Sequence, residues 1–168
     1  LIMNTQIRPA ATVILMREGT ETFEIFMVKR SIKSSFGSFY VFPGGTLDVE
    51  DSLPEMYQHC DSLSDVQASS KLALQQNGLA YWVACIRECF EEAGILLTNK
   101  SDTLLQDSKK LDAYRQQLNS KEITFYEICK ENNLQLRANN IVPFAHWVTP
   151  DIEPKRFDTR FFLAKVHS

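Results

Sequence analysis

The chain has 168 residues, of which 44% are hydrophobic and 23% are charged. These values are close to those of soluble globular domains and exclude a disordered or fibrous protein, and the length suits one domain with a single core. The formal net charge of −3 disfavours nucleic acid or an anionic membrane surface as a partner.

The cysteines and the apolar runs indicate in which cellular compartment the protein is expected. The four cysteines match neither a zinc-binding spacing nor a disulfide framework: Cys60, Cys85, Cys89 and Cys129. Packed, reduced thiols are typical of intracellular proteins. No apolar run reaches the ~20 residues that cross a bilayer, and residues 1–4 lack the features of a signal peptide. We therefore expect an intracellular protein without a membrane partner, cytoplasmic in the first place, with the peroxisome or mitochondrion as the eukaryotic alternative.

The first forty residues predict strands. Residues 11–16 and 23–28 are short apolar runs with a turn between them. Residues 39–42 form a third run, which enters a Pro-Gly-Gly break at 43–45 where the backbone can turn sharply.

Helices are predicted over the middle of the chain. Residues 52–80 carry a loose helical pattern, and residues 80–93 carry a clear one. One side of the second segment is apolar and the other acidic, with Trp82, Ile86, Cys89 and Ala93 opposite Glu88, Glu91 and Glu92. Gly94 is placed to end this helix in the left-handed conformation.

Two further helices and two strands complete the pattern. Residues 104–118 and 122–132 have apolar side chains at roughly helical intervals, and residues 141–148 and 159–166 are strand-like runs. Strands on both sides of the helices predict a mixed α/β or α+β layered domain. The elements do not alternate regularly enough for a doubly wound sheet or a barrel.

Three carboxylates crowd one turn of the acidic helix. Glu88 and Glu92 are i,i+4 neighbours with Glu91 beside them, so each pair repels by roughly a few tenths of a kcal/mol. Arg87 can offset one of them, most naturally Glu91. A hard divalent cation would relieve the rest, and Mg²⁺ prefers a few carboxylates together with water and phosphate oxygens. The plainer alternative is a solvated acidic helix face.

The full pattern resembles the Nudix box. That box reads Gly, five residues, Glu, seven residues, then Arg-Glu-U-x-Glu-Glu-x-Gly-U with U apolar. Here Gly45-x₅-Asp51 is followed by residues 87–95, which read Arg-Glu-Cys-Phe-Glu-Glu-Ala-Gly-Ile, and Phe-Pro-Gly-Gly stands at 42–45. Asp51 replaces the usual first Glu, and residues 52–86 insert 35 residues where the family has seven.

A split box of this kind resembles the Nudix-type motif 19 subgroup, whose members hydrolyse coenzyme A and its esters. Segments 157–164 and 29–31 also resemble that subgroup. The resemblance covers nearly the whole chain and implies one Nudix-like domain over 1–168, an α/β/α sandwich with a mixed sheet and helical insertions at about 52–80 and 99–138. The family has a further Glu, a strand and a closing helix beyond this point, so we expect either a chain truncated at its C-terminus or a second chain that supplies these parts.

The resemblance also implies roles for the site residues. The metal ligands would be Glu88, Glu91 and Glu92 with the carbonyl of Gly44, and Arg87 would orient the carboxylates. Either Glu88 or Glu91 would instead serve as the general base. The implied cofactor is Mg²⁺, with Mn²⁺ as the alternative.

Cationic residues are expected to bind the diphosphate. Arg30 and Arg160 are favoured because each adjoins a predicted core strand and arginine makes bidentate phosphate contacts. Lys29 and Gly45 are further candidates, as are the less favoured Lys33 and Arg156. For each basic residue, a solvated surface position or a structural ion pair is the plainer alternative.

Structural roles are favoured for the other residues considered. Core packing is favoured over ligand contact for the aromatic residues of the predicted strands: Phe36, Phe39, Tyr40, His146 and Trp147. Asp48 and Asp158 are expected in turns or at caps.

These patterns predict a Mg²⁺-dependent diphosphatase that attacks X–O–P–O–P–O–Y, with coenzyme A or acyl-CoA as the favoured small-molecule substrate. One alternative is a hydrolase of ADP-ribose or NADH, and another is a non-catalytic Nudix-fold module that binds a nucleotide-like ligand. A nucleic-acid enzyme is disfavoured by the charge, and a homodimer is left open.

Overall fold

A computed structural model describes residues 6–31, 38–60, 62–99 and 102–166. Its central strand, β1 (Ile7–Glu18), runs for 12 residues. Ala11, Val13 and Leu15 alternate along it and are fully buried, because successive strand residues face opposite sides of a sheet. The strand predicted over 11–16 is therefore confirmed, and pairing with its neighbours extends it at both ends.

The main sheet is mixed, as predicted. β7 (Arg156–Lys165) runs parallel to β1 along its length, and β6 (Ile141–Val148) is antiparallel to β7. On the other edge of β1, β2 (Phe23–Ile25) and β5 (Gly44–Thr46) are both antiparallel to it. Strands from the two ends of the chain thus lie side by side at the centre.

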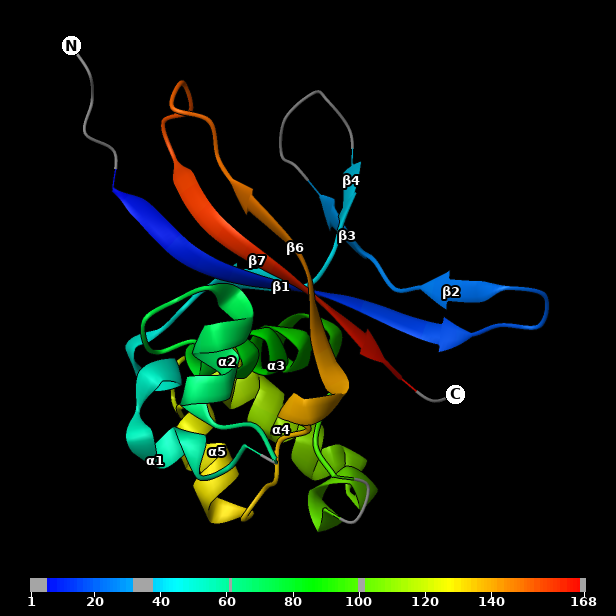
Figure 1. Cartoon of the computed structure of the whole chain (residues 1–168). Helices are drawn as coiled ribbons and strands as arrows, with labels where there is room; N and C mark the ends of the chain where they lie inside the picture. The colour runs from blue at the N-terminus through cyan, green and yellow to red at the C-terminus, as the bar shows by residue number, and fades with distance from the viewer. Residues whose placement is uncertain (1–5, 32–37, 61, 100–101, 167–168) are drawn as a thin grey trace.

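The segment predicted as one strand over 23–28 is divided, and that prediction is wrong. β2 ends at Ile25, and β3 (Val28–Ser31) pairs instead with β4 (Ser38–Val41) as a separate two-stranded sheet. The Phe26 N–H still donates to the Leu15 carbonyl at 3.0 Å, after which the chain leaves β1. Figure 1 shows this hairpin projecting away from the helices.

The acidic helix is the core of the molecule. α3 (Leu79–Ala93) is buried at every residue from 79 to 90. The Trp82 indole N–H donates to the Ile141 carbonyl at 2.9 Å, and its ring lies 4.8 Å from that of Phe162. Gly94 ends the helix with φ 70°, which confirms the predicted left-handed cap.

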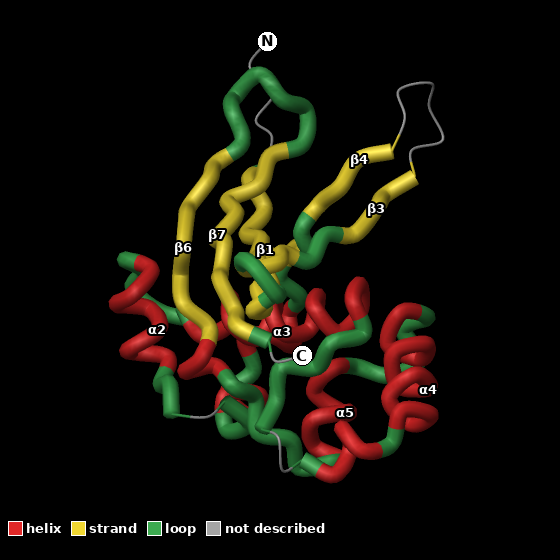
Figure 2. Tube along the Cα trace, turned by 90° about the vertical axis from the view of Figure 1, so that its right-hand side faces the viewer, coloured by secondary structure: helices red, strands yellow, loops and turns green. Residues whose placement is uncertain are grey.

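The other helical turns gather around α3. They are η1 (Val49–Ser52), α1 (Pro54–Tyr57), α2 (Asp65–Leu72), η2 (Thr103–Gln106), α4 (Ser108–Asn119), α5 (Phe125–Glu131) and η3 (Ala138–Asn140). Figures 1 and 2 show the labelled helices on one side of the sheet, with α3 next to the strands and α4 and α5 farther from them. None of the described helices is long and apolar enough to cross a membrane.

Exposed aromatic residues lie on the edge strand β6 and on the separate β3–β4 hairpin. Trp147 on the edge strand β6 is 66% exposed, and Phe39 and Tyr40 on β4 are 51% and 62% exposed. Core packing was therefore wrongly predicted for these residues and for His146, because β6 is an edge strand and the β3–β4 hairpin is a separate sheet, and the described residues leave these aromatic side chains exposed. His146 is exposed and its Nε2 lies 2.6 Å from Asp158 Oδ1. Phe36 lies outside the described residues.

Candidate active site

A buried ion pair joins the two halves of the split motif. Arg87 Nε donates to Asp51 Oδ1 at 3.0 Å and its terminal nitrogen donates to Oδ2 at 2.8 Å. That nitrogen also donates to the Thr46 carbonyl at 2.9 Å. Burial alone would lower the pKa of Arg87, but the hydrogen bonds and charge of Asp51 outweigh it and raise the pKa above its ordinary value. Arg87 therefore stays charged and holds η1 and β5 against α3.

Asp48 begins the turn that carries Asp51. Its backbone N–H donates to Asp51 Oδ2 at 2.8 Å, in a capping-box arrangement at the start of η1. The predicted capping role of Asp48 is thus confirmed. The Asp51 carboxylate thus accepts hydrogen bonds from both the Asp48 backbone and Arg87, and Asp51 is only 2% exposed.

Arg87 also holds two of the expected metal ligands. Its other terminal nitrogen donates to Glu88 Oε1 at 2.9 Å and to Glu91 Oε1 at 3.2 Å. The second contact is the i,i+4 pair expected from the helical spacing. With Asp48 Oδ2 at 3.6 Å, one guanidinium faces more carboxylates than it can neutralise. The structure thus places negative charge in excess at this point.

The third acid of the helix, Glu92, faces the start of β5, where the predicted Pro-Gly-Gly break continues as a strand from Gly44. The Gly44 N–H donates to Glu92 Oε2 at 3.1 Å, and Arg30 of β3 forms an ion pair with Glu92 Oε1. Two predicted site residues from distant segments therefore meet the carboxylate helix. Lys29 is the neighbour of Arg30 on β3, so strand alternation directs its side chain to the opposite face.

Gly45 lies directly against Glu88. A Cβ atom added at Gly45 would stand 2.2 Å from Glu88 Oε1, far inside van der Waals contact. The position therefore requires glycine for the carboxylate to keep its place. This packing role explains the glycine through close approach of backbone to a functional side chain.

Glu88 titrates near neutrality in this environment. Burial raises its pKa from 4.5 to about 7, the charge and hydrogen bond of Arg87 oppose the rise, and Glu91 and Glu92 add to it. Burial also raises the pKa of Glu91. A carboxylate with a pKa near 7 can accept or release a proton under physiological conditions.

The oxygen-only donor set of the helix fits a hard divalent cation by its chemistry. Among the described residues, however, no three acidic, histidine or cysteine side chains converge on one point. Glu88 and Glu91 turn toward Arg87 while Glu92 turns toward Arg30. Cation binding would require these carboxylates to exchange arginine contacts for metal contacts.

The remaining predicted cations lie elsewhere. Arg160 of β7 donates to the Leu72 carbonyl at the end of α2, at 3.0 Å, and approaches Asp158 at 3.5 Å. Arg160 thus joins β7 to α2 and does not contact the carboxylates of α3. Arg156 contacts Thr149 and Asp151 in the β6–β7 connection. Lys33 lies outside the described residues.

The sequence did not predict that Arg115 on α4 contacts the end of α3. Its Nε donates to the Glu91 carbonyl at 2.9 Å and a terminal nitrogen donates to the Glu92 carbonyl at 2.8 Å. These are among the last carbonyls of α3, which lack partners inside the helix. The need for a cation at this helix end is foreseeable, but a donor that lies 24 residues after Glu91 in the sequence is not.

A family model described as the NUDT19 Nudix domain matches residues 62–168. The chain belongs to this Nudix family. Acyl-coenzyme A diphosphatase NUDT19 of Xenopus laevis is 26% identical over 198 residues, covering 96% of this chain and 52% of that protein. A second curated relative, from Caenorhabditis elegans, is 26% identical over 160 residues, covering 95% of this chain and 44% of the relative. The chain thus spans about half the length of these Nudix relatives.

A solved structure supports the same fold. The crystal structure of a NUDIX hydrolase from Alicyclobacillus acidocaldarius matches with a TM-score of 0.66 and 27% identity, over 98% of this chain and 72% of that chain. The expected Nudix-like α/β architecture with a mixed sheet is therefore confirmed, with the described helices on one side of the sheet and not on both sides as in the expected α/β/α sandwich. The split Nudix box is closed in space by the contact between Asp51 and Arg87.

Proposed function

We propose that this chain is a metal-dependent diphosphatase that cleaves the diphosphate linkage of coenzyme A or an acyl-CoA. One observation carries the proposal: Gly44 and Gly45 of β5 lie against the acids of α3 across the split box, with a cation from β3 beside them. The resemblance to an acyl-coenzyme A diphosphatase supports the choice of substrate.

The metal would be Mg²⁺, with Mn²⁺ as the alternative. Glu88, Glu91 and Glu92 would hold it, with the Gly44 carbonyl as a further ligand, because these are hard oxygen donors. When bound, the ion would offset charge on the diphosphate and make an attacking water more acidic. The excess negative charge around Arg87 is consistent with a cation at this position.

The protein's own groups then have separate tasks. Glu88, with a pKa of about 7, is suited to take a proton from the attacking water, and in that role it would leave Glu91, Glu92 and the Gly44 carbonyl as the metal ligands. Arg30 is 53% exposed on its side chain and can bind diphosphate oxygens while remaining close to Glu92. The water oxygen would bond to one phosphorus as the bridging P–O bond breaks, releasing two phosphorylated halves.

Incubation of the chain with Mg²⁺ or Mn²⁺ and CoA, acetyl-CoA, ADP-ribose or NADH tests the proposal. We expect CoA or acetyl-CoA to be cleaved faster than the other two, and Glu91→Gln and Glu92→Gln to lose most of that activity. Val66→Gln on the exposed side of α2 is the control, since Val66 is 80% exposed. Cleavage of none of the four compounds, or full activity in both Glu variants, would refute the proposal.

A non-catalytic binding module is the second candidate. The observation in its favour is that the described acids are held by arginines rather than gathered around one point. This candidate predicts measurable affinity for CoA with no turnover at any metal concentration.

A further inference from the structure

A cavity of about 430 Å³ lies beside the carboxylate helix. Arg87 and Glu91 of α3 line one side of it, and Asp48 and Glu50 line the adjacent rim. The facing wall runs from the end of α4 to the start of α5, over residues 118–126. Small-molecule sites typically measure ~300–1,000 Å³, so the cavity can hold a substantial part of a substrate whose diphosphate lies at α3.

The ionisable groups around the cavity leave an excess of negative charge. The acids are Asp48, Glu50, Asp51 and Glu91, and the cations are Arg87 and Lys121. Arg87 is already bonded to its acidic neighbours. An anionic group would therefore be repelled here, whereas an uncharged group would enter without that electrostatic cost.

The wall formed by residues 118–126 combines apolar surface with a few hydrogen-bonding groups. Leu118 and Phe125 are buried and Ile123 is half-buried. Asn119 and Thr124, on the same wall, carry an amide and a hydroxyl group. The Asn119 amide donates to the Arg115 and Glu91 carbonyls at 2.8 and 3.4 Å, and the Thr124 hydroxyl is bonded to Glu127 in the cap of α5, so a ligand here meets polar groups held in fixed positions. This combination suits an uncharged chain that carries methyl and amide groups.

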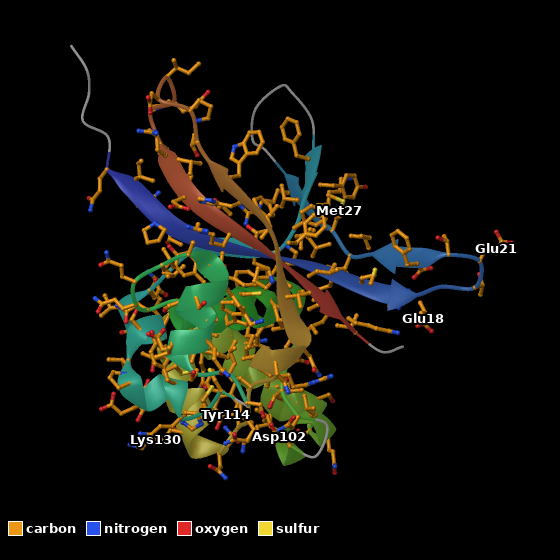
Figure 3. All side chains as sticks on the ribbon, in the orientation of Figure 1. Glu18, Glu21, Met27, Asp102, Tyr114 and Lys130 are labelled. Carbon is orange, nitrogen blue, oxygen red and sulfur yellow. The ribbon has the colours of Figure 1, made fainter. Side chains whose placement is uncertain are left out.

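The same wall is tied to the carboxylate helix. Arg115 of α4 donates to the carbonyls of Glu91 and Glu92 at 2.9 and 2.8 Å. Tyr114 donates to Glu131 at 2.7 Å, which joins α4 to α5; Figure 3 shows Tyr114 in the helical layer, remote from the sheet. The wall thus has a defined position relative to the acids of α3.

We propose that this cavity binds the pantetheine arm of a CoA-type substrate, the uncharged amide-containing chain on the opposite side of the diphosphate from adenosine. The inference rests on the proposed function and adds which half of the substrate meets residues 118–126. The phosphorylated nucleoside half then lies on the side of the β3–β4 hairpin, where Arg30 provides positive charge.

Isothermal titration calorimetry with the two halves of CoA, 4′-phosphopantetheine and 3′,5′-ADP, tests this assignment. Each is titrated into the full chain with Mg²⁺ present. Ile123→Trp places bulk inside the cavity, and Asn119→Trp obstructs its rim at an exposed residue, with loss of the Asn119 hydrogen bonds to the Arg115 and Glu91 carbonyls. Val66→Trp is the matched control, on exposed α2 surface that does not line the cavity. Thermal unfolding verifies that each variant is folded.

We expect both cavity variants to weaken 4′-phosphopantetheine binding by about tenfold or more, while 3′,5′-ADP binding changes less than about twofold. The control should leave both affinities unchanged. Unaltered 4′-phosphopantetheine binding in Asn119→Trp, selective loss of 3′,5′-ADP, or no binding of 4′-phosphopantetheine to the parent chain would each overturn the assignment. These binding measurements need no turnover. If all variants cleave CoA as fast as the parent chain, the cavity assignment is refuted and the proposed diphosphatase activity is not. If 4′-phosphopantetheine binding changes as expected but CoA is not cleaved, the proposed diphosphatase activity is refuted and the cavity assignment is not.

Discussion

Asp51 and Arg87 form a bidentate ion pair although they are 36 residues apart in the sequence. Both side chains are almost fully buried, at 2% and 5% exposed. The pair fixes η1 against α3, and α3 carries all three acids of the expected metal site. A long insertion between the two halves of the motif is therefore compatible with the site, because the ion pair restores their contact in space.

Replacing Asp51 should destabilise the fold strongly. Asp51→Ala leaves Arg87 charged and buried without its main partner, and the loss of one member of a buried pair costs about 3–5 kcal/mol. Denaturant unfolding monitored by circular dichroism measures the change. Arg17→Ala breaks the exposed pair with Glu24, whose side chains are 55% and 54% exposed, and should cost less than about 1 kcal/mol. Equal losses in the two variants would contradict a structural role for the buried pair.

The motif alone predicted much of the site. Helical spacing predicted the contact between Arg87 and Glu91, and the structure contains it. The contact between Arg87 and the adjacent Glu88 agrees with the orienting role that the family resemblance implied for Arg87. The contact between Glu92 and Gly44 spans 48 residues, and only the family resemblance linked those segments. Local periodicity carries no information about such pairings.

Other features were beyond sequence reasoning for physical reasons. The aromatic residues Phe39, Tyr40 and Trp147 have strand propensity, but propensity does not say whether other elements will cover a strand. Arg160 adjoins a core strand as expected, yet its guanidinium donates a hydrogen bond to the Leu72 carbonyl at the end of α2. Arg115 bonds to α3 from a separate helix. Each outcome depends on tertiary packing.

Adding one methyl group at Gly45 should displace Glu88. In Gly45→Ala the new Cβ would meet Glu88 Oε1 at 2.2 Å, and a shift of about 1 Å in a catalytic group can reduce turnover by about 100-fold. We expect kcat for CoA hydrolysis to fall substantially while the chain remains folded. The double variant Gly45→Ala/Glu88→Asp is the informative comparison, because the shorter acid leaves room for the methyl group. If Gly45→Ala lowers kcat as much in the Glu88→Asp background as in the parent, the close contact is not the cause.

The stability of the metal-free protein should depend on pH through Glu88. Burial raises its pKa from 4.5 to about 7, so the folded chain prefers the protonated acid. That contribution is complete below pH 4.5 and is lost as the pH rises to about 7, amounting to roughly 3 kcal/mol at most. The free energy of unfolding, measured in EDTA, should therefore fall relative to Glu88→Gln over this interval. The difference between the two proteins cancels other titrating groups, and a difference independent of pH would show that Glu88 is not perturbed.

Arg30 can act on the substrate, on Glu92, or on both, and one variant separates these roles. Its side chain is 53% exposed, and its guanidinium pairs with Glu92, which is 22% exposed. If Arg30 binds diphosphate oxygens, Arg30→Ala should raise KM for CoA by about tenfold, the equivalent of about 1.4 kcal/mol. If it only neutralises Glu92, the same change should strengthen Mg²⁺ binding and leave KM at saturating Mg²⁺ unaltered. We expect the KM increase, and Arg17→Ala on exposed β1 surface controls for the loss of one positive charge.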